Sequence, residues 1–422
     1  SVGGLVSASC RHLICWPEGV RLRAMPLDAV HKPSVHAASW CRLALFAWLA
    51  ILLGLSVRIL MRPGTHDVYG VFTTAARHWM AGAELYWPFQ PDCGADHYRY
   101  SPVVAMALAA WTLLPDHVGA VLWRLLNAAV FLTGLWFWIR LLLPRTLTST
   151  ETAAVFLLTI PLSVGSLNNG QSNALMTGLL LLATTGVVSA RWNVAAMCLA
   201  FATALKGYPL VLGLLLGLLY PTRLVPRLLA ALALLVVLSF CVQPAAYAGQ
   251  QYARWLEQFA TDDRSACAVT CATCDWRLLV RGLGAPISPQ LYLGVQVAVG
   301  AGIAALCARQ HWAGADMRSL LTTAFGLATC WMTVFGPATE SCTYILLAPI
   351  LAWAVVQGWS VHCSPWRRWL PVGCLALFSL HQAALWFPRG GQVRALGLQP
   401  LAGLLLSGWL LVTVGKDSVL SR

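Results

Sequence analysis

The chain is a succession of apolar runs that recur from Leu43 to Val414, separated by polar segments of which only two are long. A helix needs about 20 predominantly apolar residues to cross the hydrocarbon core of a bilayer, and most of these runs approach or reach that length. Only 10% of the residues are charged, compared with roughly 25% in soluble proteins. The runs do not alternate apolar and polar residues, which excludes a porin-like barrel. The sequence therefore predicts an all-α polytopic membrane protein.

The apolar runs predict a bundle of about 10–12 transmembrane or re-entrant helices. We expect residues 41–422 to form a single integral membrane domain. Residues 1–40 mix prolines with single basic residues and are expected to be a poorly ordered cytoplasmic tail without a cleavable signal peptide. The runs cover residues 43–60, 102–114, 118–143, 152–166, 171–190, 194–220, 226–243, 288–308, 319–336, 343–357, 368–387 and 396–414.

Two of these runs differ from a simple span. The run over 102–114 is too short to cross the membrane and ends at Pro115, so we expect it to be re-entrant or interfacial. The run over 194–220 is long enough, but Lys206, Gly207 and Pro209 lie at its middle. Glycine and proline there remove helical bonding, which predicts two half-helices that turn at this motif.

The basic residues support this assignment through the positive-inside rule. With the N-terminal tail inside, every predicted inner turn carries Arg or Lys. These residues are Arg140, Arg145, Arg191, Arg223, Arg227, Arg309, Arg318, Arg367, Arg368, Lys416 and Arg422. The outer segments are then 62–101, 166–170, the turn at Lys206, 244–287, 336–342 and 388–395.

The net charge of +13 does not indicate nucleic acid binding, because the basic residues stand singly at the ends of apolar runs. Cys267, Cys271 and Cys274 have a spacing that can hold an iron-sulfur cluster, but their position in an outer loop favours a disulfide or free thiols. The histidines of the first outer segment lack the i, i+4 spacing of a zinc helix. We therefore expect no metal and no cofactor.

The first outer segment has apolar residues at helical spacing, namely Val68, Val71, Phe72, Ala75, Ala76 and Trp79. They predict an amphipathic helix lying in the membrane interface. Asp67 directly precedes this helix. In a structural role, Asp67 would cap the helix N-terminus. In a functional role, its carboxylate could accept a proton from a substrate hydroxyl as a general base.

The basic and aromatic residues of the outer face can likewise be explained by a structural or by a functional role. Arg77 and Arg99 could bind a phosphate, which a guanidinium group fits bidentately. The tyrosines beside Arg99 are explained either by an aromatic belt at the interface or by contact with a substrate. Lys206 either extends its amine to the interface or faces a buried anion or carboxylate.

Amides and one acid complete the candidate site. The turn from Asn168 to Asn173 places four amides between two apolar helices, where they serve as interhelical bonding partners or line a cavity. Glu340 is the only acid between Asp316 and Asp417. In a structural role it pairs with Lys206 or an arginine, and in a functional role it binds sugar hydroxyls or assists Asp67. The candidate substrate-binding residues are Tyr69, Tyr100, Asn169, Gln171, Asn173, Tyr208 and Glu340.

The order of these motifs resembles glycosyltransferase family 87, whose multi-span enzymes have the GT-C architecture and include polyprenyl-phosphate-mannose-dependent mannosyltransferases. The resemblance covers about residues 43–414. Its most specific part is the Asn169-Gly170-Gln171-x-Asn173 string followed by Lys206 and Pro209. The other matching residues are Asp67, Gly82, Leu85, Tyr86, Tyr100, Pro102, Pro337, Tyr344 and Pro349. Some members have a histidine-rich segment where this chain has Thr339-Glu340-Ser341.

The resemblance implies a polyprenyl-phosphate sugar donor that enters from the bilayer and an acceptor that is lipid-linked or a glycan. An acidic residue in the first outer loop acts as the base in this family, which carries over to Asp67. Direct displacement at the anomeric carbon would invert its configuration, while Lys206 and nearby arginines stabilise the phosphate leaving group. The enzyme would lie in the plasma membrane with its active site on the outer face.

Two other classes of protein remain open from the sequence. A secondary transporter of a polar or anionic solute would also contain broken helices and rare intramembrane charges, but its polar residues would gather near the midplane rather than at one face. A non-catalytic assembly protein could bind a partner through the loop over 244–287. That class leaves Asp67, Lys206 and Glu340 without a shared purpose.

Overall fold

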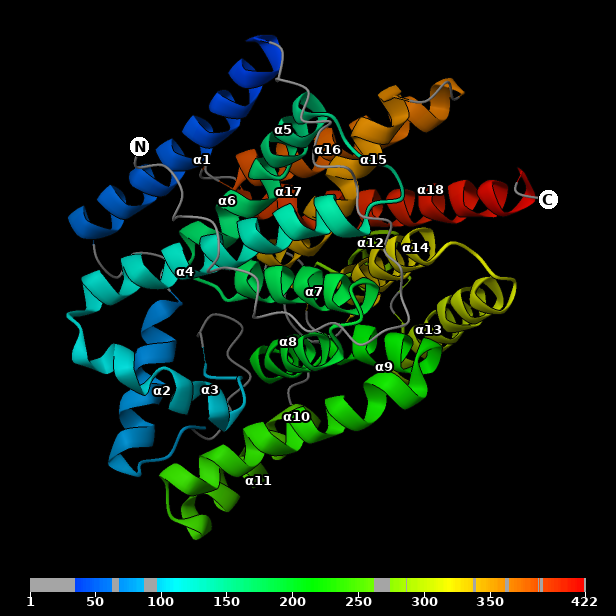
Figure 1. Cartoon of the computed structure of the whole chain (residues 1–422). Helices are drawn as coiled ribbons and strands as arrows, with labels where there is room; N and C mark the ends of the chain where they lie inside the picture. The colour runs from blue at the N-terminus through cyan, green and yellow to red at the C-terminus, as the bar shows by residue number, and fades with distance from the viewer. Residues whose placement is uncertain are drawn as a thin grey trace, which may run out of the picture.

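The protein is an all-α polytopic bundle in the computed structural model, and no strand is present among the residues that the model describes (Figure 1). These residues are 35–62, 68–86, 97–261, 274–285, 287–336, 339–360, 364–385, 387 and 390–420. The predicted tail lies outside them except for its last residues, because the first helix begins at Val35. The predicted boundary at residue 40 therefore falls inside this helix.

The elements follow the predicted apolar runs, and every one of the twelve runs is helical. The α-helices are α1 (Val35–Met61), α2 (Tyr69–Ala81), α3 (Pro102–Ala107), α4 (Asp116–Phe137), α5 (Ser149–Leu158), α6 (Ile160–Asn168), α7 (Asn173–Val188), α8 (Trp192–Leu205), α9 (Leu210–Leu219), α10 (Pro221–Val242), α11 (Ala245–Thr261), α12 (Trp276–Gly282), α13 (Pro289–Trp312), α14 (Met317–Cys330), α15 (Ala348–Ser360), α16 (Pro365–Ala384), α17 (Gly390–Ala395) and α18 (Leu398–Leu420). Short 3₁₀ or π-helical segments are η2 (Ala109–Leu113), η3 (Trp138–Leu142), η4 (Trp331–Phe335) and η5 (Ser341–Leu347).

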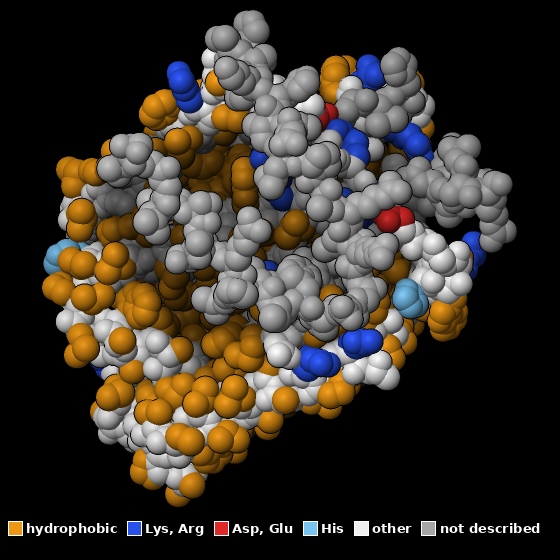
Figure 2. Space-filling model, viewed as in Figure 1, with side chains coloured by type: hydrophobic (Ala, Val, Ile, Leu, Met, Phe, Trp, Pro, Cys, Tyr) orange, Lys and Arg blue, Asp and Glu red, His pale blue; other side chains and the backbone are white. Residues whose placement is uncertain are grey.

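Within the described residues, 6 helices are long and apolar enough to cross a membrane, and the bent pair α5 and α6 brings the number to 7 if it forms one span. The helices α7, α8 and α9 are apolar but shorter. Hydrophobic side chains cover much of the described surface in Figure 2, and Lys and Arg side chains are few and scattered. This surface suits contact with lipid.

The run over 102–114, which we expected to be re-entrant or interfacial, does not form one long helix. It is broken into α3 and η2, and both elements contact α2. On one side of the run, the Tyr100 ring lies 4.4 Å from the Phe72 ring of α2. On the other side, Asp116 at the start of α4 forms an ion pair with Arg77 of the same helix. The residues on both sides of the run therefore contact the same helix, α2.

The run over 194–220 is broken where the Lys206 motif predicts. The helix α8 ends at Leu205, and Lys206 has extended backbone angles (φ −151°, ψ 138°). Pro209 precedes the first residue of α9 and supplies no backbone N–H, so the two half-helices are separated without a lost donor. Both prediction and structure thus give two half-helices with a polar break between them.

The segments that connect the helices divide between two ends of the bundle. At one end, which we call the site end, residues 97–101, 166–173, 206–209 and 339–341 lie together. At the opposite end, Arg145 binds Gln357 at 2.9 Å and Arg227 binds Asn193 at 3.0 Å. Each group contains only segments that the charge pattern assigns to one face, so the predicted helix directions are mutually consistent.

The amphipathic helix predicted in the first outer segment is present as α2, but its apolar face packs on protein. Phe72 and Trp79 are fully buried, and the Phe72 ring contacts Trp123 of α4. Tyr98 and Tyr100 are also buried in this cluster, so the aromatic-belt explanation is wrong for these two residues. An apolar stripe demands burial but does not specify lipid or protein as the partner.

Glycines allow α4 and α7 to pack closely. A Cβ atom added to Gly178 of α7 would clash with the backbone carbonyl of Val130 on α4, and one added to Gly134 would clash with the carbonyl of Gly178. Small residues at such crossings bring the backbones of membrane helices together. This contact fixes α7, and with it the residues at its N-terminus, against α4.

Candidate active site

The site is built on the polar turn between α6 and α7. The helix α6 ends at Asn168, and Gly170 adopts a left-handed conformation with φ +66°. The Gly170 N–H donates to the Leu167 carbonyl and the Gln171 N–H donates to the Ser166 carbonyl, both at 3.2 Å. Glycine ends helices in this way because it has no Cβ to penalise a positive φ. The turn then leads directly into Asn173, the first residue of α7.

Side chains of α4 bind the carbonyl groups of this turn. Arg124 donates from Nε to the Leu167 oxygen at 2.9 Å and from Nη2 to the Asn168 oxygen at 3.1 Å. Trp123 donates from Nε1 to the Gly170 oxygen at 2.8 Å. Carbonyls at a helix C-terminus have no partner within their own helix, and an unpaired carbonyl in an apolar environment is costly. The donors from α4 therefore stabilise the turn in one conformation.

Arg124 is a residue that the sequence analysis missed, although the sequence contained the signal. It is a charge inside the apolar run over 118–143, and a charge at membrane depth usually has a specific partner. Only 3% of its surface is exposed.

The turn also contacts the first outer segment. The backbone N–H of Val68 donates to the Asn169 carbonyl at 3.0 Å. Val68 is the residue directly before α2. Asp67, the proposed base, precedes Val68 in the chain and lies outside the described residues.

Gln171 joins this turn to the segment that carries Glu340. The Gln171 Nε2 donates to Glu340 Oε2 at 2.6 Å, and Asn173 Nδ2 donates to Gln171 Oε1 at 2.5 Å. Glu340 lies at the N-terminus of η5, in extended conformation. The amides of the turn therefore act as bonding partners between α7 and η5. A charge-assisted hydrogen bond of this kind is stronger than a neutral one.

The Lys206 break lies beside the same carboxylate. The Lys206 Nζ is 5.9 Å from the centre of the Tyr208 ring. The Tyr208 hydroxyl is close enough to Glu340 and to Tyr100 to interact with them electrostatically. The Lys206 amine interacts in the same way with the Cys342 thiol. The structure thus brings the break between α8 and α9 to the segment over 339–343.

Three other predicted site residues, Arg77, Tyr69 and Arg99, make contacts with α4 and α11. The Arg77 guanidinium forms its ion pair with Asp116 at 2.5 Å, and both side chains are largely exposed. Tyr69 is buried, with its hydroxyl against Gly119 of α4. The backbone carbonyl of Arg99 accepts a hydrogen bond from Trp255 Nε1 at 3.3 Å.

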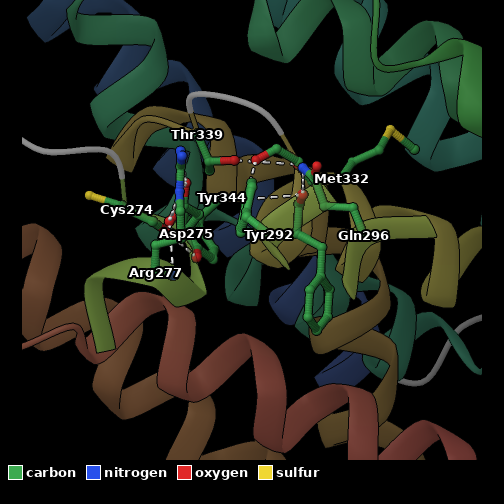
Figure 3. Close-up of polar contacts among 10 residues, drawn as sticks. Cys274, Asp275, Arg277, Tyr292, Gln296, Met332, Thr339 and Tyr344 are labelled. Atoms are coloured by element: carbon green, nitrogen blue, oxygen red, sulfur yellow. Dashed lines mark hydrogen bonds and ion pairs between the residues drawn. The ribbon is translucent and has the colours of Figure 1, made fainter. Parts of the chain in front are cut away.

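A polar network around Cys274 and Asp275 binds Thr339 and Tyr344, the residues on either side of Glu340 (Figure 3). Asp275 is fully buried and binds Arg277 at 2.8 Å. The neighbouring Cys274 donates its N–H to the Thr339 carbonyl at 2.7 Å, and its carbonyl accepts the Tyr344 hydroxyl at 2.6 Å. These contacts fix residues on both sides of Glu340. The sequence analysis missed them because they join segments that are far apart in the chain.

A second set of contacts reaches the residue after Glu340. The Ser341 hydroxyl lies 3.1 Å from His381 Nε2 of α16 and 3.3 Å from the Cys274 sulfur. Gln399 of α18 donates to the Ser341 carbonyl at 3.1 Å. Glu340 is therefore carried by a segment with bonds to the 274–275 segment, α16 and α18.

The cysteine cluster suggested by the sequence is represented in the described residues by Cys274 alone, since Cys267 and Cys271 lie outside them. Burial raises the pKa of the Cys274 thiol, which therefore stays protonated at neutral pH. A protonated thiol is a poor metal ligand and nucleophile. Among the residues that can be described, no group of three or more His, Cys, Asp or Glu side chains is placed to hold a metal ion.

The sequence model of glycosyltransferase family 87 matches residues 98–337, more than half of the chain. This range contains the turn over 168–173, the Lys206 break and Tyr100, whereas Asp67 and Glu340 lie on either side of it. A search of curated proteins gave no match. The order of motifs and the all-helical membrane fold agree with the family match. The chain therefore belongs to glycosyltransferase family 87.

Proposed function

We propose that this membrane glycosyltransferase transfers a sugar, in our assignment mannose, from a polyprenyl-phosphate donor to a hydroxyl of a lipid-linked or glycan acceptor. The observation that carries the proposal is the joining of Gln171 to Glu340 beside the Lys206 break. Three segments that are remote in the chain contribute an amide, a carboxylate and an amine to one end of the bundle. Polar groups of this kind are retained at membrane depth chiefly where they serve a function.

In the proposed reaction, the acceptor hydroxyl attacks the anomeric carbon of the donor. The new bond forms between the acceptor oxygen and this carbon, the bond from the carbon to the phosphate oxygen breaks, and the acceptor proton passes to the Asp67 carboxylate. The lipid phosphate leaves with the bonding electron pair. A single displacement inverts the configuration at the anomeric carbon.

We assign the stabilisation of the leaving phosphate to Lys206, with Arg99 and Arg77 as further donors. Cationic donors lower the free energy of the transition state when they face the oxygen on which charge develops. The position of Lys206 supports this role, because the residue lies in the extended break after α8, beside Tyr208, and not within a helix. The exposed pair with Asp116 makes Arg77 the weakest of the three candidates.

We assign sugar recognition to Glu340, Gln171 and Asn173, with Tyr69, Tyr100, Tyr208 and Asn169 as further substrate-binding residues. Carboxylates and amides supply acceptors and donors that match the hydroxyls of a sugar. The Gln171 bond holds the Glu340 carboxylate in one orientation.

We place the reaction on the outer face of the plasma membrane. The support is the positive-inside pattern, which assigns basic residues to every turn at the opposite end of the bundle. A donor with a polyprenyl chain would reach the site laterally from the bilayer.

The experiment that tests this function measures sugar transfer from polyprenyl-phosphate mannose by the Asp67→Asn variant in purified membranes. Asn is as good a helix cap as Asp but cannot accept the proton, so transfer should be abolished while the amount of protein is unchanged. Full retention of transfer would exclude Asp67 as the base and leave only the capping role.

The assignment of Lys206 has its own test. We expect Lys206→Ala to weaken binding of polyprenyl-phosphate mannose by about tenfold or more, because a charge-assisted bond to the phosphate is lost. Unaltered donor affinity would instead show that the amine only reaches toward the interface.

A further inference from the structure

Three polar side chains lie on one face of α11 at intervals of four residues, namely Tyr247, Gln251 and Trp255. Residues four apart lie above one another on a helix. Gln243, the C-cap of α10, precedes Tyr247 by four residues in the chain, and we call these four side chains the row. Gln250, Arg254 and Glu257, which lie outside this row on α11, are exposed.

Each side chain of this row bonds to the backbone of the first outer segment. Gln243 Nε2 donates to the Trp79 carbonyl at 2.5 Å, and the Tyr247 hydroxyl donates to the Ala83 carbonyl at 2.6 Å. The next member, Gln251, accepts from the Leu85 N–H through Oε1 at 3.0 Å.

The fourth bond is made to the same outer segment, but to a residue that follows 87–96 in the chain. Trp255 Nε1 donates to the Arg99 carbonyl at 3.3 Å. The row therefore holds the chain both before and after residues 87–96. Figure 1 shows α11 at the same lower end of the view as α2 and α3, and α11 contacts α3 directly.

The bond between Gln251 and Leu85 is buried, and the other three bonds are partly buried, which makes the row more than a surface contact. Gln251 is 1% exposed, and Leu85 is also buried. A buried backbone N–H that loses its partner is costly, so Leu85 depends on Gln251 for a bond that water cannot readily replace. Side-chain bonds from one rigid helix thus set the path of the first outer segment.

We propose that α11 is a positioning element for the active site, and that Gln243, Tyr247, Gln251 and Trp255 hold the segment that carries Arg99 and Tyr100 in its donor-binding position. The functional part of this inference rests on the proposed function, since Arg99 is assigned there to the donor phosphate. The four residues act through the backbone of the segment that they bind.

Hydrogen–deuterium exchange of the purified full chain in nanodiscs tests the contact without any assumption about the substrate. Gln251→Met keeps the approximate side-chain volume but removes the acceptor, so exchange of the Leu85 amide should become about tenfold faster. Gln251→Glu keeps an acceptor oxygen and should restore slow exchange. Gln250→Met, on the exposed face, is the matched control and should leave the Leu85 amide unchanged.

The Gly170 amide provides an internal reference, because it donates to the Leu167 carbonyl of its own turn and not to α11. Its exchange should be the same in all variants. Unchanged exchange of Leu85 in Gln251→Met would overturn the proposal. If Gln251→Met fails to fold, Trp255→Phe tests the same row, through faster exchange over residues 97–100.

Sugar transfer from polyprenyl-phosphate mannose tests the consequence for the site. We expect Gln251→Met and Trp255→Phe to raise the donor KM by about five- to tenfold and to change kcat by less than about twofold, since binding geometry and not the reacting groups is altered. Faster exchange with an unchanged KM would overturn the positioning role. If the unaltered chain transfers no sugar from this donor, the proposed function fails and the exchange result alone decides whether α11 holds the segment.

Discussion

Arg124 shows how one residue can determine the shape of a site that it does not enter. Its guanidinium group donates to the carbonyls of Leu167 and Asn168, and also to Ala120 of its own helix at 3.0 Å. A guanidinium group presents several donors in a fixed plane, so one side chain can bind carbonyls that point in different directions. The turn that carries Gln171 is thereby fixed from α4.

We expect Arg124→Lys to destabilise the protein by about 2–4 kcal/mol, because a single ammonium cannot reach all of these carbonyls. Thermal unfolding in detergent should show a lower Tm. Arg140→Lys is the matched control, since Arg140 is exposed and its guanidinium lies 4.5 Å from the centre of the Trp136 ring. Equal Tm values for both variants would contradict a special role for Arg124.

Replacement of Glu340 by Gln separates the effect of its negative charge from the effect of its hydrogen bond to Gln171. Glu340→Gln keeps an oxygen that can accept the Gln171 bond, so the Tm should change little. Transfer should fall by about tenfold or more if the negative charge takes part in binding the sugar, since charged hydrogen bonds are the stronger ones. Glu257→Gln on the exposed face of α11 is the control. Unchanged transfer in Glu340→Gln would assign the carboxylate a structural role.

At the level of single elements, the apolar runs predicted all six helices that are long and apolar enough to span a membrane, and also the breaks in the runs over 102–114 and 194–220. The bend between α5 and α6, inside the run over 152–166, was not predicted. Run length and helix-breaking residues act locally, so the short run over 102–114 and the Lys206 motif could be interpreted without tertiary information. The helices α11 and α12 were not predicted, because they lie in a long outer loop without an apolar run. The packing of α2 on protein also escaped prediction, since its stripe only demands burial.

The contact between α4 and α7 makes a prediction for an element pair. Gly178→Ala would place a methyl group against the Val130 carbonyl, which belongs to a helix backbone and cannot rotate away. We expect a loss of about 1–3 kcal/mol, seen as a lower Tm. Gly54→Ala in α1 is the control, because a Cβ there meets nothing within 4 Å. In that helix alanine should be neutral or slightly stabilising.

For the whole molecule, the list of candidate site residues was easier to predict than their pairing. Scarcity of charge in the membrane singled out Lys206 and Glu340, because each would be expensive without a purpose. The partner of Glu340, Gln171, lies 169 residues away in the chain. Which remote segments meet depends on how the helices pack, and one sequence does not reveal that. The network around Cys274 and Ser341 was hidden for the same reason.

The arrangement of the bundle also predicts which end faces the outside. The site end contains the segments that the positive-inside rule places outside, and the turn between α13 and α14 belongs to the basic, inner set. Gln250 on α11 and Ala315 in that turn are both exposed, so each can be replaced by cysteine without disturbing a buried group.

A membrane-impermeant maleimide applied to intact cells should label Gln250→Cys above the background of the natural cysteines. Ala315→Cys should be labelled only after the membrane is permeabilised. The reverse pattern would place the Gln171–Glu340 contact on the cytoplasmic side, where the sugar would be transferred to an inner-leaflet or cytoplasmic acceptor. Labelling of both positions in intact cells would contradict the division of the connecting segments between two membrane faces, on which the direction of every helix depends.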